Sequence, residues 1–76
     1  MKSNNMQIVV KARFESTKQD IEGFGGGRYL VYLPFEEDSE SEKMIIHLLS
    51  KYMIVPPNRI LYKGRNMNKD FVFEVL

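Results

Sequence analysis

The chain has 76 residues and a formal net charge of +1, from 11 Lys and Arg against 10 Asp and Glu. A chain of this length forms one small domain, residues 1–76, with no room for separate catalytic and regulatory parts. It contains no cysteine, which excludes a disulfide framework and a thiolate metal site, and it has no apolar run of the roughly 20 residues that a membrane span needs. We therefore expect a cytoplasmic protein without a membrane partner, whose residues 1–6 form a disordered tail.

Residues 7–14, QIVVKARF, alternate between two faces. Ile8, Val10 and the alternate residues after them point one way, and the residues between them point the other. This period of two predicts a half-buried strand. Residues 28–34, RYLVYLP, are rich in β-branched and aromatic side chains and predict a second strand, which Pro34 ends.

Four glycines lie between these two strands, in the segment GFGGG at 23–27. A glycine loop that cradles a phosphate follows a strand and opens a helix, whereas a strand pattern follows this one. We therefore predict that residues 15–27 form a mobile hairpin loop in which glycine permits positive φ, with Phe24 tucked against the edge of the core. Contact of this loop with a ligand remains the alternative.

A helix is predicted from Ser39, because Ser39 and Glu42 have the spacing of a capping box. Pro56 and Pro57 end this helix. One apolar stripe recurs at helical spacing and is expected to face the core: Met44, Ile45, Leu48, Leu49 and Tyr52.

Two more strands follow the helix. Residues 59–63, RILYK, predict the third and residues 71–76, FVFEVL, predict the fourth, with polar turn residues between them. The order β-β-α-β-β predicts a two-layer α+β domain, in which one main helix covers one face of a four-stranded sheet. The other face is left open to water or to a partner.

This arrangement resembles the YggU-like family of small uncharacterised domains over nearly all of residues 7–76. The stretches that carry the resemblance are IVVKAR, DIEGFGGGRYLVYLP, MIIHLLSKYMIVPPNRILYKG and FVFEV. The resemblance implies a two-layer α/β fold with a mixed sheet in strand order 2-1-4-3. It implies no function, because no activity is established for the family.

The chain departs from the two polar signatures of that family. Gly-Lys-Ala-Asn at the helix start is replaced by SESE at 39–42, and Gly-x-x-Ser-Arg-x-Lys between the last two strands keeps only Gly64, within GRNMNKD. Family members usually continue into a C-terminal helix, and this chain is expected to have none. The chain is therefore either a divergent member with altered activity or a protein that shares only the scaffold of the family.

Opposite charges are segregated along the chain. Residues 36–42, EEDSESE, hold five acids and no base, and residues 59–69, RILYKGRNMNK, hold four bases and no acid. The basic segment favours a non-enzymatic binding module that contacts RNA or another acidic surface, because Lys and Arg bind phosphates. The residues expected to bind a nucleic acid or an anion are Arg59, Tyr62, Lys63, Arg65 and Lys69. Lys11, Arg13 and Tyr32 would extend this site across the open face.

Two other interpretations of the same features stay open. A charged hairpin is also an ordinary way to protect a sheet edge from aggregation. The alternative function is a structural or protein-interaction subunit, which pairs as a homodimer through apolar surface on the open sheet face. Its expected contact residues are Tyr29, Tyr32, Tyr62 and Met67. The oligomeric state is thus left as monomer or homodimer.

Enzymatic activity is the least favoured function. With one histidine and no cysteine, no nucleophile–base pair can be assembled, so we expect no catalytic residues, no cofactor and no metal. His47 falls between Lys43 and Lys51 at helical spacing and is expected on the surface. The acidic residues 36–42 lack the spacing of a calcium loop and are expected to form a solvated helix start.

Overall fold

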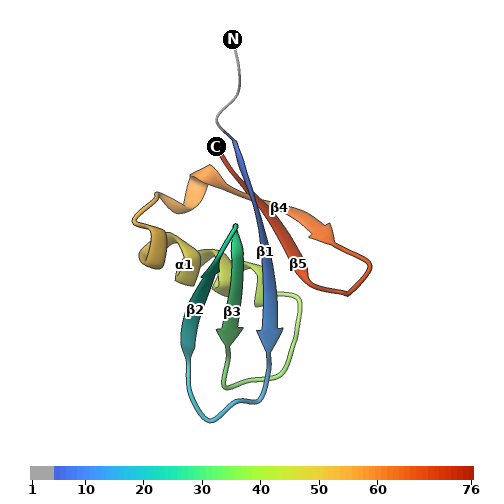
Figure 1. Ribbon diagram of the computed structural model, residues 1–76. Coiled ribbons are helices and arrows are strands. Elements are labelled where there is room, and N and C mark those ends of the chain that lie inside the picture. Colours follow the sequence, from blue (N-terminus) through green and yellow to red (C-terminus); the bar gives the residue numbers. More distant parts are fainter. Residues whose placement is uncertain (1–4) are drawn as a thin grey trace.

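The computed structural model describes residues 5–76, which form two layers, a sheet and an α-helix that lies behind it in Figure 1. The predicted α+β class with one main helix is therefore confirmed for the described part of the chain. The elements in chain order are β1 (Met6–Arg13), β2 (Asp20–Gly25), β3 (Arg28–Tyr32), α1 (Ser41–Met53), the short 3-10 helix η1 (Pro57–Arg59), β4 (Ile60–Arg65) and β5 (Phe71–Val75). The tail expected over 1–6 falls mostly on residues 1–4, which lie outside the described residues, but Met6 already belongs to β1.

The sheet is mixed and has five strands in the order β2-β3-β1-β5-β4, so the expected count of four is wrong. β1 runs parallel to β3 and antiparallel to β5, and the outer pairs β2–β3 and β5–β4 are antiparallel. The four strands that the sequence predicted are adjacent in the expected order, as β3-β1-β5-β4. β2 adds the further strand at the edge beside β3.

β2 forms where the sequence predicted only a mobile loop. Its backbone pairs with that of β3, so the tight hairpin closes between β2 and β3 instead of between the first two predicted strands. Glycine has the predicted role at this turn, because Gly25, Gly26 and Gly27 all have positive φ. A glycine-rich segment has low strand propensity, and this explains why the sequence pattern did not reveal the strand.

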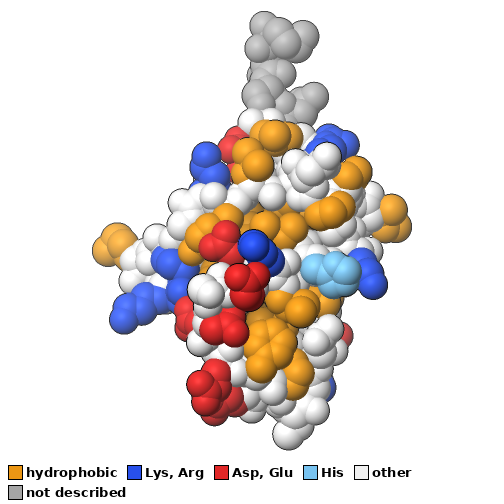
Figure 2. All heavy atoms as spheres, turned by 180° about the vertical axis from the view of Figure 1, so that it is seen from behind, with side chains coloured by type: hydrophobic (Ala, Val, Ile, Leu, Met, Phe, Trp, Pro, Cys, Tyr) orange, Lys and Arg blue, Asp and Glu red, His pale blue; other side chains and the backbone are white. Residues whose placement is uncertain are grey.

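The helix α1 packs on one face of the sheet and closes the apolar core. Every second strand residue faces the helix, as the period of two predicts. The buried hydrophobic residues are Ile8, Val10, Val31, Leu33, Ile45, Leu49, Ile60, Phe71, Phe73 and Val75. Figure 2 looks onto the helix side, where apolar side chains lie among acidic and basic ones. The intervening strand residues point to the opposite side, which no other element of residues 5–76 covers, and we call this side the open face.

The apolar stripe of α1 is buried at its centre, as expected. Ile45 and Leu49 are inaccessible to solvent, and Met44 and Leu48 are partly buried against the core. Tyr52 at the end of the stripe is half exposed, and its ring meets that of Tyr29 edge-on, with 5.7 Å between the ring centroids. In the described chain, no helix is long and apolar enough to cross a membrane.

The expected capping box at Ser39 and Glu42 is wrong. α1 begins at Ser41, and the residue before it, Glu40, makes no side-chain cap. Ser41 is buried, its Oγ accepts the backbone N–H of Asp38 at 2.9 Å, and Asp38 Oδ1 accepts the backbone N–H of Glu40 at 2.8 Å. These bonds form a turn ahead of the helix, and the turn moves the helix start past the predicted residue.

Gly27 is the turn glycine for which the fold has the strictest requirement. Its φ is +76°, and a Cβ there would lie 2.7 Å from the backbone oxygen of Gln7 on β1. Gly26 has a similar φ of +61°, but a Cβ there would meet nothing within 4 Å. The two positions therefore separate backbone strain from close approach.

We expect Gly27→Ala to lower the free energy of unfolding by clearly more than Gly26→Ala, measured by urea denaturation. Both variants carry the strain of a positive φ, about 1–2 kcal/mol, and Gly27→Ala adds the clash with β1. Equal losses for the two variants would contradict the close approach of this turn to β1.

Candidate functional site

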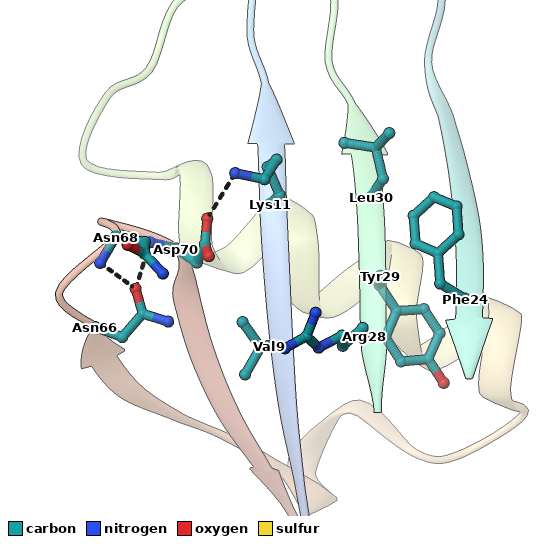
Figure 3. A pocket seen from close by; sticks show the side chains of 9 residues that line it. All are labelled: Val9, Lys11, Phe24, Arg28, Tyr29, Leu30, Asn66, Asn68 and Asp70. Carbon is teal, nitrogen blue, oxygen red and sulfur yellow. Dashed lines mark hydrogen bonds and ion pairs between the residues drawn. The ribbon is translucent and has the colours of Figure 1, made fainter. Parts of the chain in front are cut away.

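A hollow of about 400 Å³ lies on the open face. β1 and β3 form its floor, β2 borders it on one side, and the β4–β5 turn, residues 66–70, borders it on the other (Figure 3). The residues that line it are Val9, Lys11, Phe24, Arg28, Tyr29, Leu30, Asn66, Asn68 and Asp70. Its volume is at the lower end of small-ligand sites, which span about 300–1,000 Å³.

Phe24 borders the hollow from β2 and is 63% exposed, so the expectation that it is tucked against the core is wrong. The pairing of β2 with β3 shifts register between Gly23 and Gly25. Phe24 is the extra residue of this β-bulge, and a bulge commonly re-aims the side chain that it carries. An aromatic ring is therefore presented to solvent at the edge of the hollow.

Arg28 begins β3, and its guanidinium reaches over β1 beside Val9 (Figure 3). Within residues 5–76 this guanidinium makes neither an ion pair nor a hydrogen bond. The floor around it is formed by Val9 and Leu30, which are apolar and offer no side-chain acceptor. Arg28 therefore keeps its N–H donors for a ligand.

Lys11 and Asp70 form an ion pair that joins the floor of the hollow to its wall. Lys11 Nζ lies 3.5 Å from Asp70 Oδ1, and the exposed fractions of the two side chains are 59% and 14%. A pair with one partner in water contributes about 0–1 kcal/mol to stability. A ligand can therefore exchange contacts with this pair at small cost.

Asn66 organises the turn that carries Asp70. Its Oδ1 accepts the backbone N–H groups of both Asn68 and Asp70, each at 2.9 Å. The backbone N–H of Asn66 donates to the carbonyl of Asp70, and Lys69 between them has a φ of +65°. Because the side chain of Asn66 satisfies two backbone donors, the turn holds Asn68 and Asp70 in fixed positions at the wall of the hollow.

Arg65 fastens this turn to the loop before α1. Its Nε donates to the carbonyl of Lys69 at 2.7 Å, and its Nη1 lies 2.7 Å from Glu37 Oε2. Its guanidinium also stacks over the ring of Phe71, with 4.0 Å to the centroid. The acidic and basic segments of the sequence therefore meet at Glu37 and Arg65, and the charge of Arg65 is already compensated within the fold.

The structure separates the residues that the sequence grouped into one site. Arg59 donates from Nε and Nη2 to the carbonyl of Leu76, at the end of β4 away from the turn. The ring of Tyr62 packs against those of Phe71 and Phe73 on the helix side of the sheet, with the Phe73 centroid at 5.5 Å. Neither residue borders the hollow.

Two cations of the basic segment lie near the open face. Lys63 lies on this face, with its Nζ 3.6 Å from Glu74 Oε1. Lys69 lies in the turn that borders the hollow and, within residues 5–76, forms no ion pair. With Arg65 clamped to Glu37, Lys63 and Lys69 are the members of the predicted set that can extend a site from the hollow.

The aromatic and methionine residues expected on the open face divide between the two sides. Tyr29 and Tyr62 place their rings on the helix side, so that expectation is wrong for both. Tyr32 is partly buried, and Lys18 Nζ lies 4.4 Å from the centroid of its ring. Met67 is fully exposed in the β4–β5 turn.

The remaining titratable candidates lie outside the hollow. His47 is exposed on α1, where the histidine is pale blue in Figure 2. In the acidic segment, Glu37 binds Arg65 and Glu40 lies 3.4 Å from Lys43. Across residues 5–76, no three His, Cys, Asp or Glu side chains are grouped so as to hold a metal ion.

Sequence reasoning included Asn66 and Asn68 in the basic hairpin but missed Arg28 and Asp70 of the hollow. A signal for Arg28 was present, because the alternation of RYLVY puts Arg28, Leu30 and Tyr32 on one face, and Tyr32 was expected on the open face. No comparable signal marked Asp70. It lies beside Lys11 because β5 pairs antiparallel with β1, and that register is a property of the folded sheet.

Comparison with known proteins adds no assignment to this geometry. No protein-family model, no curated protein and no solved structure matches the chain. The resemblance to the YggU-like family therefore stays a prediction, and the hollow and its residues are the features from which a function can be inferred.

We expect Asn66→Ala to lower the free energy of unfolding by about 1–2 kcal/mol, because two side-chain-to-backbone hydrogen bonds are lost. Asn68→Ala is the matched control, since Asn68 is exposed and only its backbone N–H takes part in the turn; its effect should stay within about 0.5 kcal/mol. Urea denaturation of both variants tests this. Indistinguishable stabilities would show that Asn66 does not hold the turn.

Proposed function

We propose that this protein is a non-enzymatic binding module that holds single-stranded RNA across the open face of its sheet. The observation that carries the proposal is the unpartnered guanidinium of Arg28, which reaches over the apolar floor of the same hollow that the exposed ring of Phe24 borders. A cation and an aromatic platform in one hollow suit a phosphate and a base of the same strand.

The charges around the hollow support a polyanionic ligand. Arg28 lacks an acidic partner in residues 5–76, and the side chain of Lys11 is more than half exposed. Lys63 and Lys69 from the basic segment lie toward the β4 side of the same face or in the adjoining turn. Cations that neutralise phosphates release condensed counterions, and this release drives the binding of nucleic acids.

The exposed ring of Phe24 favours a single strand over a duplex. Stacking of a base on an aromatic side chain is worth about 1–3 kcal/mol. The base must offer a free face for this contact, which a base inside a duplex does not have. An aromatic ring at the rim of a cationic hollow therefore points to unpaired nucleotides.

A homodimer through the open face is the second candidate, and the distribution of apolar side chains favours it less. In the described chain, the large apolar residues that are exposed are Met6, Phe24, Tyr52, Ile54, Leu61, Met67 and Leu76. They are spread over both layers, a turn and the chain end and do not form one patch on the open face. Stable interfaces need a contiguous apolar centre.

We expect Arg28→Ala to weaken binding of a short single-stranded RNA and to reduce the slope of log affinity against log salt by about 1. Phe24→Ala should cost about 1–3 kcal/mol of binding free energy through lost stacking. Fluorescence anisotropy with a labelled RNA at several salt concentrations measures both effects. Lys51→Ala and Ile54→Ala are the matched controls, because they remove an exposed cation and an exposed apolar side chain at the end of α1.

Four outcomes would count against the proposal. Binding that does not depend on salt would remove the phosphate contact. Equal effects of Arg28→Ala and Lys51→Ala would remove the hollow as the site. Equal affinity for polyglutamate would indicate an acidic protein surface as the ligand, and concentration-dependent sedimentation without RNA binding would indicate the homodimer.

A further inference from the structure

We infer that the Lys11–Asp70 pair reads a guanine base, next to a base that stacks on Phe24, with Arg28 on the phosphate between them. This inference rests on the proposed binding of single-stranded RNA and names the preferred base. The residues involved come from three neighbouring strands and from the β4–β5 turn, and they meet in one hollow (Figure 3).

The carboxylate of Asp70 is unexpected in a site proposed to bind phosphates. It lines the same hollow as Arg28 and Lys11, where a negative charge repels phosphate. Its position is fixed from behind, because Asn66 Oδ1 holds the backbone N–H of Asp70 at 2.9 Å. A carboxylate in a nucleic-acid site is favourable only where it meets hydrogen-bond donors, and in RNA these are the ribose 2′-hydroxyl groups and the donors on base edges, of which only the base edges can present two adjacent donors to one carboxylate.

Guanine is the base whose edge matches the pair most completely. Its N1–H and its 2-amino group are adjacent donors that one carboxylate accepts together, and its O6 is an acceptor beside them. Asp70 supplies the two acceptors, and Lys11 Nζ, 3.5 Å from Asp70 Oδ1, supplies a donor for O6. Uracil offers a single donor, and adenine and cytosine offer one amino group each, so each makes fewer bonds with the same pair.

The distance across the sheet separates stacking from base reading. Phe24 on β2 and Asp70, the residue before β5, are three strand spacings apart, roughly 14 Å at about 4.8 Å per strand. One base does not span this distance, whereas two consecutive nucleotides do. Arg28 lies between them, over β1, and is placed for the phosphate that links the two nucleotides. The hollow therefore fits a two-nucleotide step in which the base on Phe24 is unrestricted and the other is guanine.

The experiment compares three short RNAs that differ at one central position. The first contains only uridine, the second has one guanosine in the uridine strand, and the third has inosine there, which keeps N1–H and O6 but lacks the 2-amino group. A bidentate contact discriminates bases by about 1–3 kcal/mol, so the guanosine strand should bind at least about fivefold tighter than the uridine strand. The inosine strand should lose most of this preference, with the protein unchanged.

Asp70→Asn should remove the preference for guanosine while leaving binding of the uridine strand equal or tighter, because a negative charge is lost. Asp20→Asn, which makes the same chemical change on β2 beside Lys18, is the control and should keep the preference. Binding of all three RNAs with equal affinity, or a guanosine preference that inosine or Asp70→Asn retains, would overturn the inference and leave the RNA-binding function standing. Failure of every RNA to bind would overturn both.

Discussion

The packing of one helix against one face of the sheet is the constraint on which the rest of the structure depends. Strand side chains alternate, so every second residue must be apolar to build the core with α1, as Ile8, Val10 and Phe73 do. The residues between them point away from the core and do not have to be apolar. In the described chain, core packing therefore does not dictate the composition of the open face, and this is why the proposal for function rests on an unpartnered Arg28 and a mostly exposed Phe24 on that face.

The sequence predicted those parts of the fold in which apolar side chains recur with the period of a strand or a helix. The alternation in 7–14 and the helical stripe of 44–52 gave the core strands, the helix and the covered face. β2 was not predicted, because its glycines have low strand propensity and the strand is held by backbone pairing with β3. The bulge that exposes Phe24 was not predicted either, because it is part of the same backbone pairing. The four core strands follow the order implied by the resemblance, as β3-β1-β5-β4, although no comparison shows the family itself.

Charge in the sequence was a poorer guide to the site than alternation. The basic segment 59–69 was predicted from the sequence to be a binding surface. In the fold, Arg65 forms an ion pair with Glu37, and Arg59 donates to the carbonyl of Leu76. Cations of this kind stabilise the domain, and fewer of their N–H donors are available to a ligand. A cation without a partner in residues 5–76, Arg28, came from β3 instead, and the pairing of β5 with β1 placed Asp70 beside Lys11. Tertiary contacts decide which charged side chains form ion pairs within the fold. These contacts join residues that are far apart in the sequence, so no short stretch of sequence shows them.

The most direct test of the account is a titration of isotope-labelled protein with single-stranded RNA, followed by backbone amide chemical shifts in NMR spectra. If the open face is the site, the shifts that move with RNA belong to β1, to the start of β3, to the bulge on β2 and to the 66–70 turn, while the amides of α1 stay in place. Changes concentrated in α1 and the acidic 36–42 segment, or no changes at saturating RNA and low salt, would contradict it.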